Sequence, residues 1–185
     1  SIDACCEAAS TPLHFVTHSL GGIVARAYLA SHRPAHLGRV VMLAPPNQGS
    51  PLVDRFGDDW WFRNILGPTA ADLGSRPGSF PNRLPPPSYP LGIIAGRHAF
   101  ASLVGGRMLG ENDGVVSVDG TRVTGMTDFL VVRSGHVQIR RNDEVADETV
   151  HFLRYGRFRD TTEDDATSVE PQAAATADDA EGARP

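Results

Sequence analysis

The serine between an apolar run and a glycine pair is the feature of this 185-residue chain that most directly indicates chemistry. Ser19 lies in the string Thr17-His18-Ser19-Leu20-Gly21, directly after the apolar run 13–17. In a sharp strand-to-helix turn a serine hydroxyl projects from the backbone, and the amide of the next residue, Leu20, is free at the helix start to donate to an oxyanion. We expect Gly21 to avoid a clash where strand and helix cross. The pattern is T-x-S-x-G, whereas the usual form begins with glycine.

A serine of this kind needs a base and an acid further along the chain. A histidine removes the hydroxyl proton, and a carboxylate orients the histidine. On strand-turn-helix scaffolds the chain order is serine, acid, histidine. Asp113, in a Glu-Asn-Asp-Gly turn, and His136, in a Ser-Gly-His string, satisfy this order, and both follow apolar runs. Because the carboxyl ends of parallel strands meet at one edge of a sheet, the sequence predicts that these side chains lie close to Ser19.

Each of the three residues also has an interpretation without chemistry. Ser19 is alternatively an ordinary helix N-cap, Asp113 a turn-forming residue of an Asp-Gly pair, and His136 an exposed loop histidine. Other residues then become candidates for the acid and the base. The alternatives that remain open are Asp119 and then Asp128 for the acid, and His151 for the base.

The other histidines and the cysteines do not form a metal-site pattern. His18 precedes the serine, and we expect its side chain to point away from it. Four more histidines precede the predicted acid, lack partners at metal-ligand spacing, and are expected to be structural or surface residues. The two cysteines are adjacent, which suits neither a zinc site nor a structural disulfide. The four histidines are His14, His32, His36 and His98.

Apolar runs that alternate with helical patterns predict an α/β fold, with a mainly parallel sheet and flanking helices. The predicted strands are 13–17, 39–43, 91–95 and 129–132, and the predicted helices are 20–32 and 143–155. Arg33 and Pro34 end the first helix, and Asn142 or Asp143 caps the second. These elements place all three chemical side chains after strands.

Composition divides the chain into a body, 1–159, and a tail. Residues 160–185 contain eight acidic residues, one arginine and almost no large apolar side chain, so we expect an acidic disordered tail. Residues 50–90 combine Phe56, Trp60, Trp61 and Phe62 with many prolines, which predicts a lid-like insertion over the end of the sheet.

Charge and residue usage exclude several classes of function. The net charge is −5, of which the tail contributes −7 and the body +2, and the nearly neutral body lacks the basic stripe that nucleic acid requires. The chain has no lysine, which excludes Schiff-base and phosphate-loop chemistry. No apolar run reaches the roughly 18 residues of a membrane helix, and the start of the chain lacks a signal-peptide pattern. We therefore expect no stable membrane span and, by default, a cytoplasmic location.

Four segments of this chain resemble the α/β-hydrolase superfamily, specifically its small lipase- and esterase-like serine hydrolases. They occur in the family's order, and the resemblance spans residues 1 to about 159. The segments are 15–22, 43–50, 112–117 and 134–136. The resemblance implies a partial α/β-hydrolase fold in which the amino-terminal strands are missing.

The resemblance also implies a reaction and a role for each site residue. Ser19 would be the nucleophile, His136 the base and acid, and Asp113 the carboxylate that orients it. Leu20 would supply one oxyanion donor, and the loop with Pro46 would line the mouth of the pocket. The implied reaction is hydrolysis of a carboxylic ester, of a small molecule or a lipid, through an acyl-serine intermediate and without cofactor or metal.

One departure from the family concerns the start of the chain. Only 18 residues precede Ser19, so the loop that usually gives the second oxyanion donor is missing, at an expected cost of about 10²- to 10³-fold in kcat. The first strand, central in the family, would have a bare edge. We therefore hypothesise that the chain is the carboxyl-terminal part of a longer hydrolase. The alternative is a catalytically silent hydrolase-fold fragment or a binding module. The sequence does not decide between hydrolysis and acyl transfer, and it gives neither the acyl length and head group of the substrate nor the oligomeric state.

Overall fold

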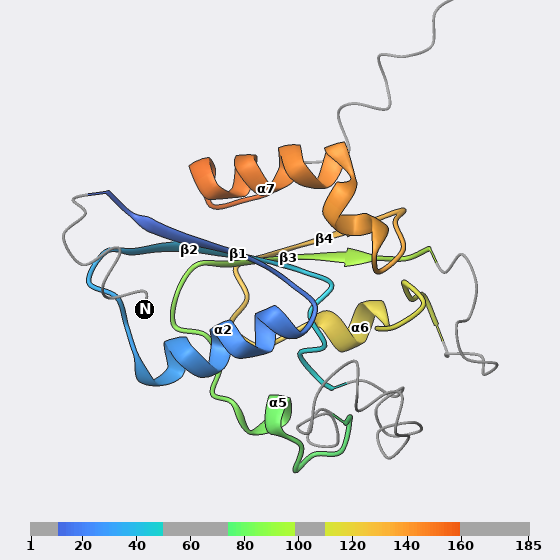
Figure 1. Ribbon diagram of the computed structural model, residues 1–185, viewed down its shortest axis with the longest axis horizontal. Coiled ribbons are helices and arrows are strands. Elements are labelled where there is room, and N and C mark those ends of the chain that lie inside the picture. Colours follow the sequence, from blue (N-terminus) through green and yellow to red (C-terminus); the bar gives the residue numbers. More distant parts are fainter. Residues whose placement is uncertain (1–10, 50–73, 99–109, 160–185) are drawn as a thin grey trace, which may run out of the picture.

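The computed structural model describes residues 11–49, 74–98 and 110–159 (Figure 1). Four parallel strands form one sheet in the order β1-β2-β3-β4. The strands are β1 (Leu13–His18), β2 (Leu37–Leu43), β3 (Leu91–Gly96) and β4 (Asp128–Val132). The helices are α2 (Leu20–Ser31), α5 (Phe80–Arg83), α6 (Val118–Thr121), the 3₁₀ turn η2 (Gln138–Arg141) and α7 (Asp143–Tyr155).

The predicted α/β architecture is confirmed. All four predicted strands form, with ends that differ by at most two residues, and both predicted helices form. Asn142 caps α7 by accepting a hydrogen bond from the Val145 amide, and Gly156 in a left-handed conformation ends the helix. The short elements α5, α6 and η2 were not predicted, because four residues are too few to show a helical period.

Two other predictions fall on parts of the chain outside the described residues. They are the aromatic part of the predicted lid-like insertion, with Phe56, Trp60, Trp61 and Phe62, and the acidic tail 160–185. The described end of the insertion contains α5.

The sheet is covered on both faces. Helix α2 lies on one face, with α5 and α6 on the same side, and α7 lies on the other (Figure 1). Strand alternation sends side chains to the two faces in turn, so each face has its own core. The core under α7 includes Val41, Ile94 and Phe152, and the core under α2 includes Val40, Ile93 and Leu29. Because both faces are covered, β3 is buried along its whole length.

Strand β1 forms one edge of the sheet. Within the described part of the chain it pairs only with β2, and Val16 is 51% exposed. The resemblance had implied a bare outer edge for this strand, and the structure has that arrangement in the described residues.

Gly92 of β3 permits close contact between the sheet and the chain that covers it. A Cβ atom at this position would lie 2.8 Å from ring atoms of Phe152 and Phe158. No real Cβ contact is that short, so glycine is the residue that lets these two rings pack directly on β3.

Among the described residues, none of the helices has the length and apolar character needed to cross a bilayer.

Candidate active site

Ser19 occupies the sharp turn between β1 and α2. Its backbone has φ 54° and ψ −128°, a region that L-residues rarely adopt. The turn is held on both sides, because the Ser19 amide donates to the Leu43 carbonyl at 2.9 Å and the Ser19 carbonyl accepts from the Gly22 amide at 2.9 Å. The Ser19 side chain makes no capping hydrogen bond to α2, so the N-cap interpretation does not describe this residue.

The glycine that permits the close approach is Gly22 and not Gly21, so the prediction for Gly21 was wrong. A Cβ atom at Gly21 would meet the Thr17 Cβ at 3.6 Å, an ordinary contact. At Gly22 it would lie 3.0 Å from the Pro45 Cβ and 3.2 Å from the Met42 sulfur. The face of α2 that crosses the sheet closely therefore points toward β2 and the loop that follows it.

Asp113 lies in a tight turn after β3 and is buried, 4% exposed. Its Oδ1 accepts hydrogen bonds from the amides of Val115 and Val116, at 2.9 and 2.8 Å. Its Oδ2 accepts a hydrogen bond of 2.7 Å from Nδ1 of His136. The turn amides thus fix the carboxylate and leave one oxygen for the imidazole.

His136 connects the carboxylate to the serine. It lies between β4 and η2, is 9% exposed, and donates from Nδ1 to Asp113 because a carboxylate oxygen only accepts. In the neutral ring Nε2 then carries the lone pair, and this atom lies 2.9 Å from the Ser19 Oγ. The structure therefore brings together all three side chains that the sequence predicted for the chemistry.

The alternative acids and base lie elsewhere. Asp119, in α6, has a 94% exposed side chain that pairs with Arg122 at 3.8 Å. Asp128 is at the start of β4 and accepts hydrogen bonds from backbone amides, one of them that of Phe158. His151 is on α7, where its Nδ1 bonds the Arg157 carbonyl. None of the three contacts Ser19.

The His18 side chain was expected to point away from Ser19, and the structure places its ring beside that of His136. Its ring does not stand apart from the site, because its centroid lies 5.0 Å from that of the His136 ring, and its Nε2 lies 2.8 Å from the His136 carbonyl oxygen. Burial lowers the pKa of His18 and outweighs the hydrogen bond to the His136 carbonyl, which raises it; the charges of the His136 ring and of Arg140 lower it further. One signal could have suggested this position: His18 and Thr17 are neighbours in a strand, so they face opposite sides of the sheet.

The loop after β2 is fixed by a buried polar network. Arg26 of α2 donates to the carbonyl and side-chain oxygens of Asn47, and Asn47 donates to the Thr121 carbonyl at 2.8 Å. No local pattern in the sequence indicated this network. Leu20 is the first residue of α2, so its amide is one of the N–H groups without an intrahelical acceptor. Pro46 lies in the fixed loop and is buried.

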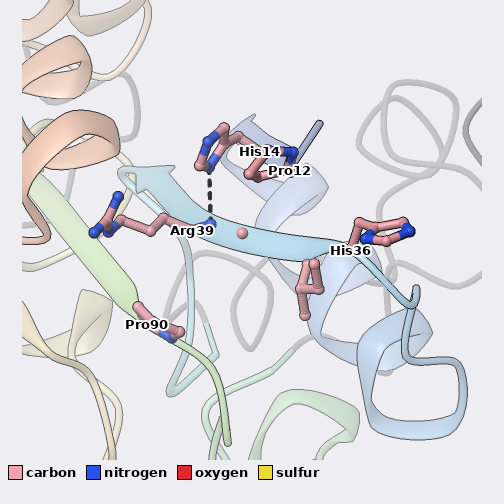
Figure 2. Close-up of a pocket in the computed structure, with 7 residues that line it drawn as sticks. Pro12, His14, His36, Arg39 and Pro90 are labelled. Carbon is pink, nitrogen blue, oxygen red and sulfur yellow. Dashed lines mark hydrogen bonds between the residues drawn. The ribbon is translucent and has the colours of Figure 1, made fainter. Parts of the chain in front are cut away.

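A hollow lies at the other end of the strands, where β1 and β2 begin (Figure 2). It is lined by residues at the starts of β1 and β2 and before β3, including His14, Arg39 and Pro90. The His14 ring accepts a hydrogen bond of 2.8 Å from the Arg39 amide.

Among the described residues, no group of three or more His, Cys, Asp or Glu side chains is placed to hold a metal ion.

Comparisons with known proteins support the fold. No protein-family model matches the chain, and no curated protein matches its sequence. The structure is similar to the crystal structure of Bacillus licheniformis lipase BlEst2 in mature form, with a TM-score of 0.62 and 24% identity over 77% of this chain. It is also similar to the propeptide form of that lipase, with a TM-score of 0.59 and 24% identity over 91% of this chain.

The likeness concerns the fold and only part of the lipase. The chain spans 66% of the mature form and 38% of the propeptide form. Together with the all-parallel sheet and its flanking helices, these matches define the chain as an α/β-hydrolase fold that corresponds to part of a lipase chain. The predicted fold class is thereby confirmed, and the fold is like that of esterases and lipases.

Proposed function

We propose that this protein is a serine hydrolase that acts on carboxylic esters through an acyl-serine intermediate. The observation that supports the proposal is the hydrogen-bonded series Asp113–His136–Ser19, with distances of 2.7 and 2.9 Å, at the carboxyl ends of the strands. The strained backbone of Ser19 adds to it, since non-glycine residues with positive φ concentrate at functional sites.

The proposed first step is attack of the Ser19 Oγ on the ester carbonyl carbon. Nε2 of His136 takes the hydroxyl proton as the Oγ–C bond forms, and Asp113 stabilises the resulting imidazolium through the Nδ1–H hydrogen bond. The tetrahedral intermediate places its oxyanion near the Leu20 amide. His136 then returns the proton to the departing alkoxide, which leaves an acyl-serine and an alcohol.

The proposed second step repeats this chemistry with water. His136 accepts a proton from the water, which attacks the acyl carbon, and Ser19 leaves with the proton that His136 returns. The products are a carboxylic acid and the regenerated serine. No step uses a metal or an organic cofactor. In this proposal the loop with Pro46 lines the mouth of the pocket, and the substrate is a small-molecule or lipid ester.

A fluorophosphonate probe tests whether Ser19 is an activated nucleophile. The probe is incubated with the chain and with its Ser19→Ala variant, and the covalent adduct is measured by intact mass. Ser31→Ala is the matched control, because Ser31 is at the other end of α2 and its hydroxyl contacts only helix carbonyls and the neighbouring ring of His32. We expect labelling of the chain and of Ser31→Ala, and none of Ser19→Ala.

Turnover of p-nitrophenyl esters of increasing acyl length, with the same variants, then tests ester hydrolysis itself. Folded protein that neither labels nor hydrolyses any ester would refute the proposal and leave the silent binding module as the better description. Labelling that persists in Ser19→Ala would show that another residue reacts.

A further inference from the structure

Both the backbone amide and the backbone carbonyl of His136 are hydrogen-bonded to other residues of the candidate site. Its amide donates to the Asp113 carbonyl at 3.0 Å. Its carbonyl is 2.8 Å from Nε2 of His18, the residue next to Ser19 in the chain. The backbone that carries the His136 imidazole is therefore fixed by Asp113 at its amide and by His18 at its carbonyl.

The sheet explains why the His18 ring reaches this carbonyl. His18 is the last residue of β1, and alternation along the strand puts its side chain on the face opposite Phe15 and Thr17. Phe15 packs in the core under α2, so His18 points to the other face, where the chain leaves β4 and enters η2. There the two imidazoles lie with their planes tilted by 49°.

We propose that His18 is a positioning residue: its Nε2–H holds the His136 carbonyl and so keeps the His136 imidazole within reach of the Ser19 hydroxyl. The inference rests on the proposed function, and it adds a fourth side chain to the site. His18 touches neither substrate nor the reacting atoms, so it acts only through His136.

The chemistry of the contact fixes the state of the ring. A carbonyl oxygen can only accept, so Nε2 of His18 must carry the proton. The charged groups that act on this ring are His136, Arg140 and Asp113, and burial is the largest influence on its pKa, which is lowered. A neutral donor suits this place, because a second cation beside His136 would oppose formation of the imidazolium.

Small displacements of a catalytic base have large effects on rate. An error of about 1 Å in the position of a reacting group can cost on the order of 100-fold. The Ser19–His136 distance of 2.9 Å is already within hydrogen-bond reach, so loss of the His18 contact can only loosen this arrangement. We expect a slower reaction of Ser19 without a change in the fold.

Two substitutions of His18 separate the donor from the volume of the ring. His18→Gln places an amide N–H near the position of Nε2 and cannot titrate, whereas His18→Phe fills the space without a donor. His36→Phe is the matched control, since His36 is an exposed histidine at the other end of the strands, just before β2. The rate of fluorophosphonate labelling is measured for each variant, and thermal unfolding shows that each is folded.

We expect His18→Phe to label about 10-fold more slowly than the unchanged chain, and His18→Gln and His36→Phe to label within about threefold of it. Equal rates for the Phe variant and the unchanged chain would overturn the proposal. A folded Gln variant as slow as the Phe variant would also overturn it, because the donor would then not be the cause.

A proton NMR measurement that does not depend on activity separates this inference from the proposed function. The Nδ1 proton of His136, shared with Asp113, is followed as a far-downfield signal. Positioning by His18 predicts a sharp signal in the unchanged chain and in His18→Gln, and a broadened one in His18→Phe. If no form labels, the proposed function fails, and the NMR result still decides: the same signal in all three forms overturns the inference.

Discussion

Replacing Ser19 with glycine or with alanine gives two proteins that should be equally inert and unequally stable. Both lack the hydroxyl, so both lose the 2.9 Å contact with His136 and, by the proposed mechanism, all labelling. They differ in backbone strain at position 19, because Ser19 has φ 54°. Glycine adopts positive φ without steric cost, whereas alanine keeps a Cβ atom and therefore keeps the strain.

The expected difference follows from two opposing contributions. A non-glycine residue in such a sparsely populated region costs about 1–3 kcal/mol. Glycine gives up about 0.4–1 kcal/mol through the greater freedom of its unfolded chain. We therefore expect Ser19→Gly to unfold with a free energy about 1 kcal/mol larger than that of Ser19→Ala, which corresponds to roughly 2–4 °C in melting temperature for a chain of this size.

Urea unfolding of the two variants measures the difference directly, provided that both show the same dependence on urea concentration. The matched pair is Ser31→Gly and Ser31→Ala, at the last residue of α2. Ordinary helix propensity applies there, so the order should reverse and alanine should be the more stable by up to about 1 kcal/mol. If Ser19→Ala equals or exceeds Ser19→Gly in stability, the turn is not strained and the reasoning is refuted.

Three further predictions concern the candidate site and the residues that position it. Asp113→Asn should slow labelling by roughly 10³- to 10⁴-fold without unfolding the protein, since the His136 tautomer is no longer fixed; fast labelling would contradict this. Gly96→Ala would bring a Cβ atom into collision with the Ser134 carbonyl oxygen and should lower the free energy of unfolding, measured in urea, by about 1–3 kcal/mol; Gly78→Ala, where a Cβ atom would have nothing within 4 Å, should change it little. The folded-state pKa of His18 is lowered from 6.5, so its unfolded form binds protons more readily and stability should fall as pH drops below about 6.5. Urea unfolding at pH 7 and pH 5 should show a smaller loss for His18→Gln, and equal losses would contradict the assignment.

Much of the site was readable from the sequence, because its signals are local. A turn serine before a glycine pair, an acidic residue in an Asp-Gly turn and a histidine after an apolar run each depend on a few neighbouring residues. The order of serine, acid and histidine in the chain favoured Ser19, Asp113 and His136 but left Asp119 and His151 open. The structure places Ser19, Asp113 and His136 in hydrogen-bonding contact.

Packing was less readable, because it depends on which residues meet across the fold. The sequence assigned the close helix–sheet approach to Gly21, but the side of α2 that faces β2 makes Gly22 the tight position. A pattern of letters does not give the rotation of a helix about its own axis to the accuracy of one residue. The buried network of Arg26 and Asn47 escaped notice for a similar reason, since it joins the helix after Ser19 to the loop after β2.

The sequence by itself determined the alternation of strands and helices, since hydrophobic period and turn chemistry are properties of neighbouring residues. It also predicted which side chains are candidates for nucleophile, base and acid. Only the tertiary structure decided that the His18 ring lies against His136, a residue 118 positions away. That contact exists because the carboxyl ends of β1 and β4 lie at the same end of one parallel sheet, and no local rule specifies which rings meet there.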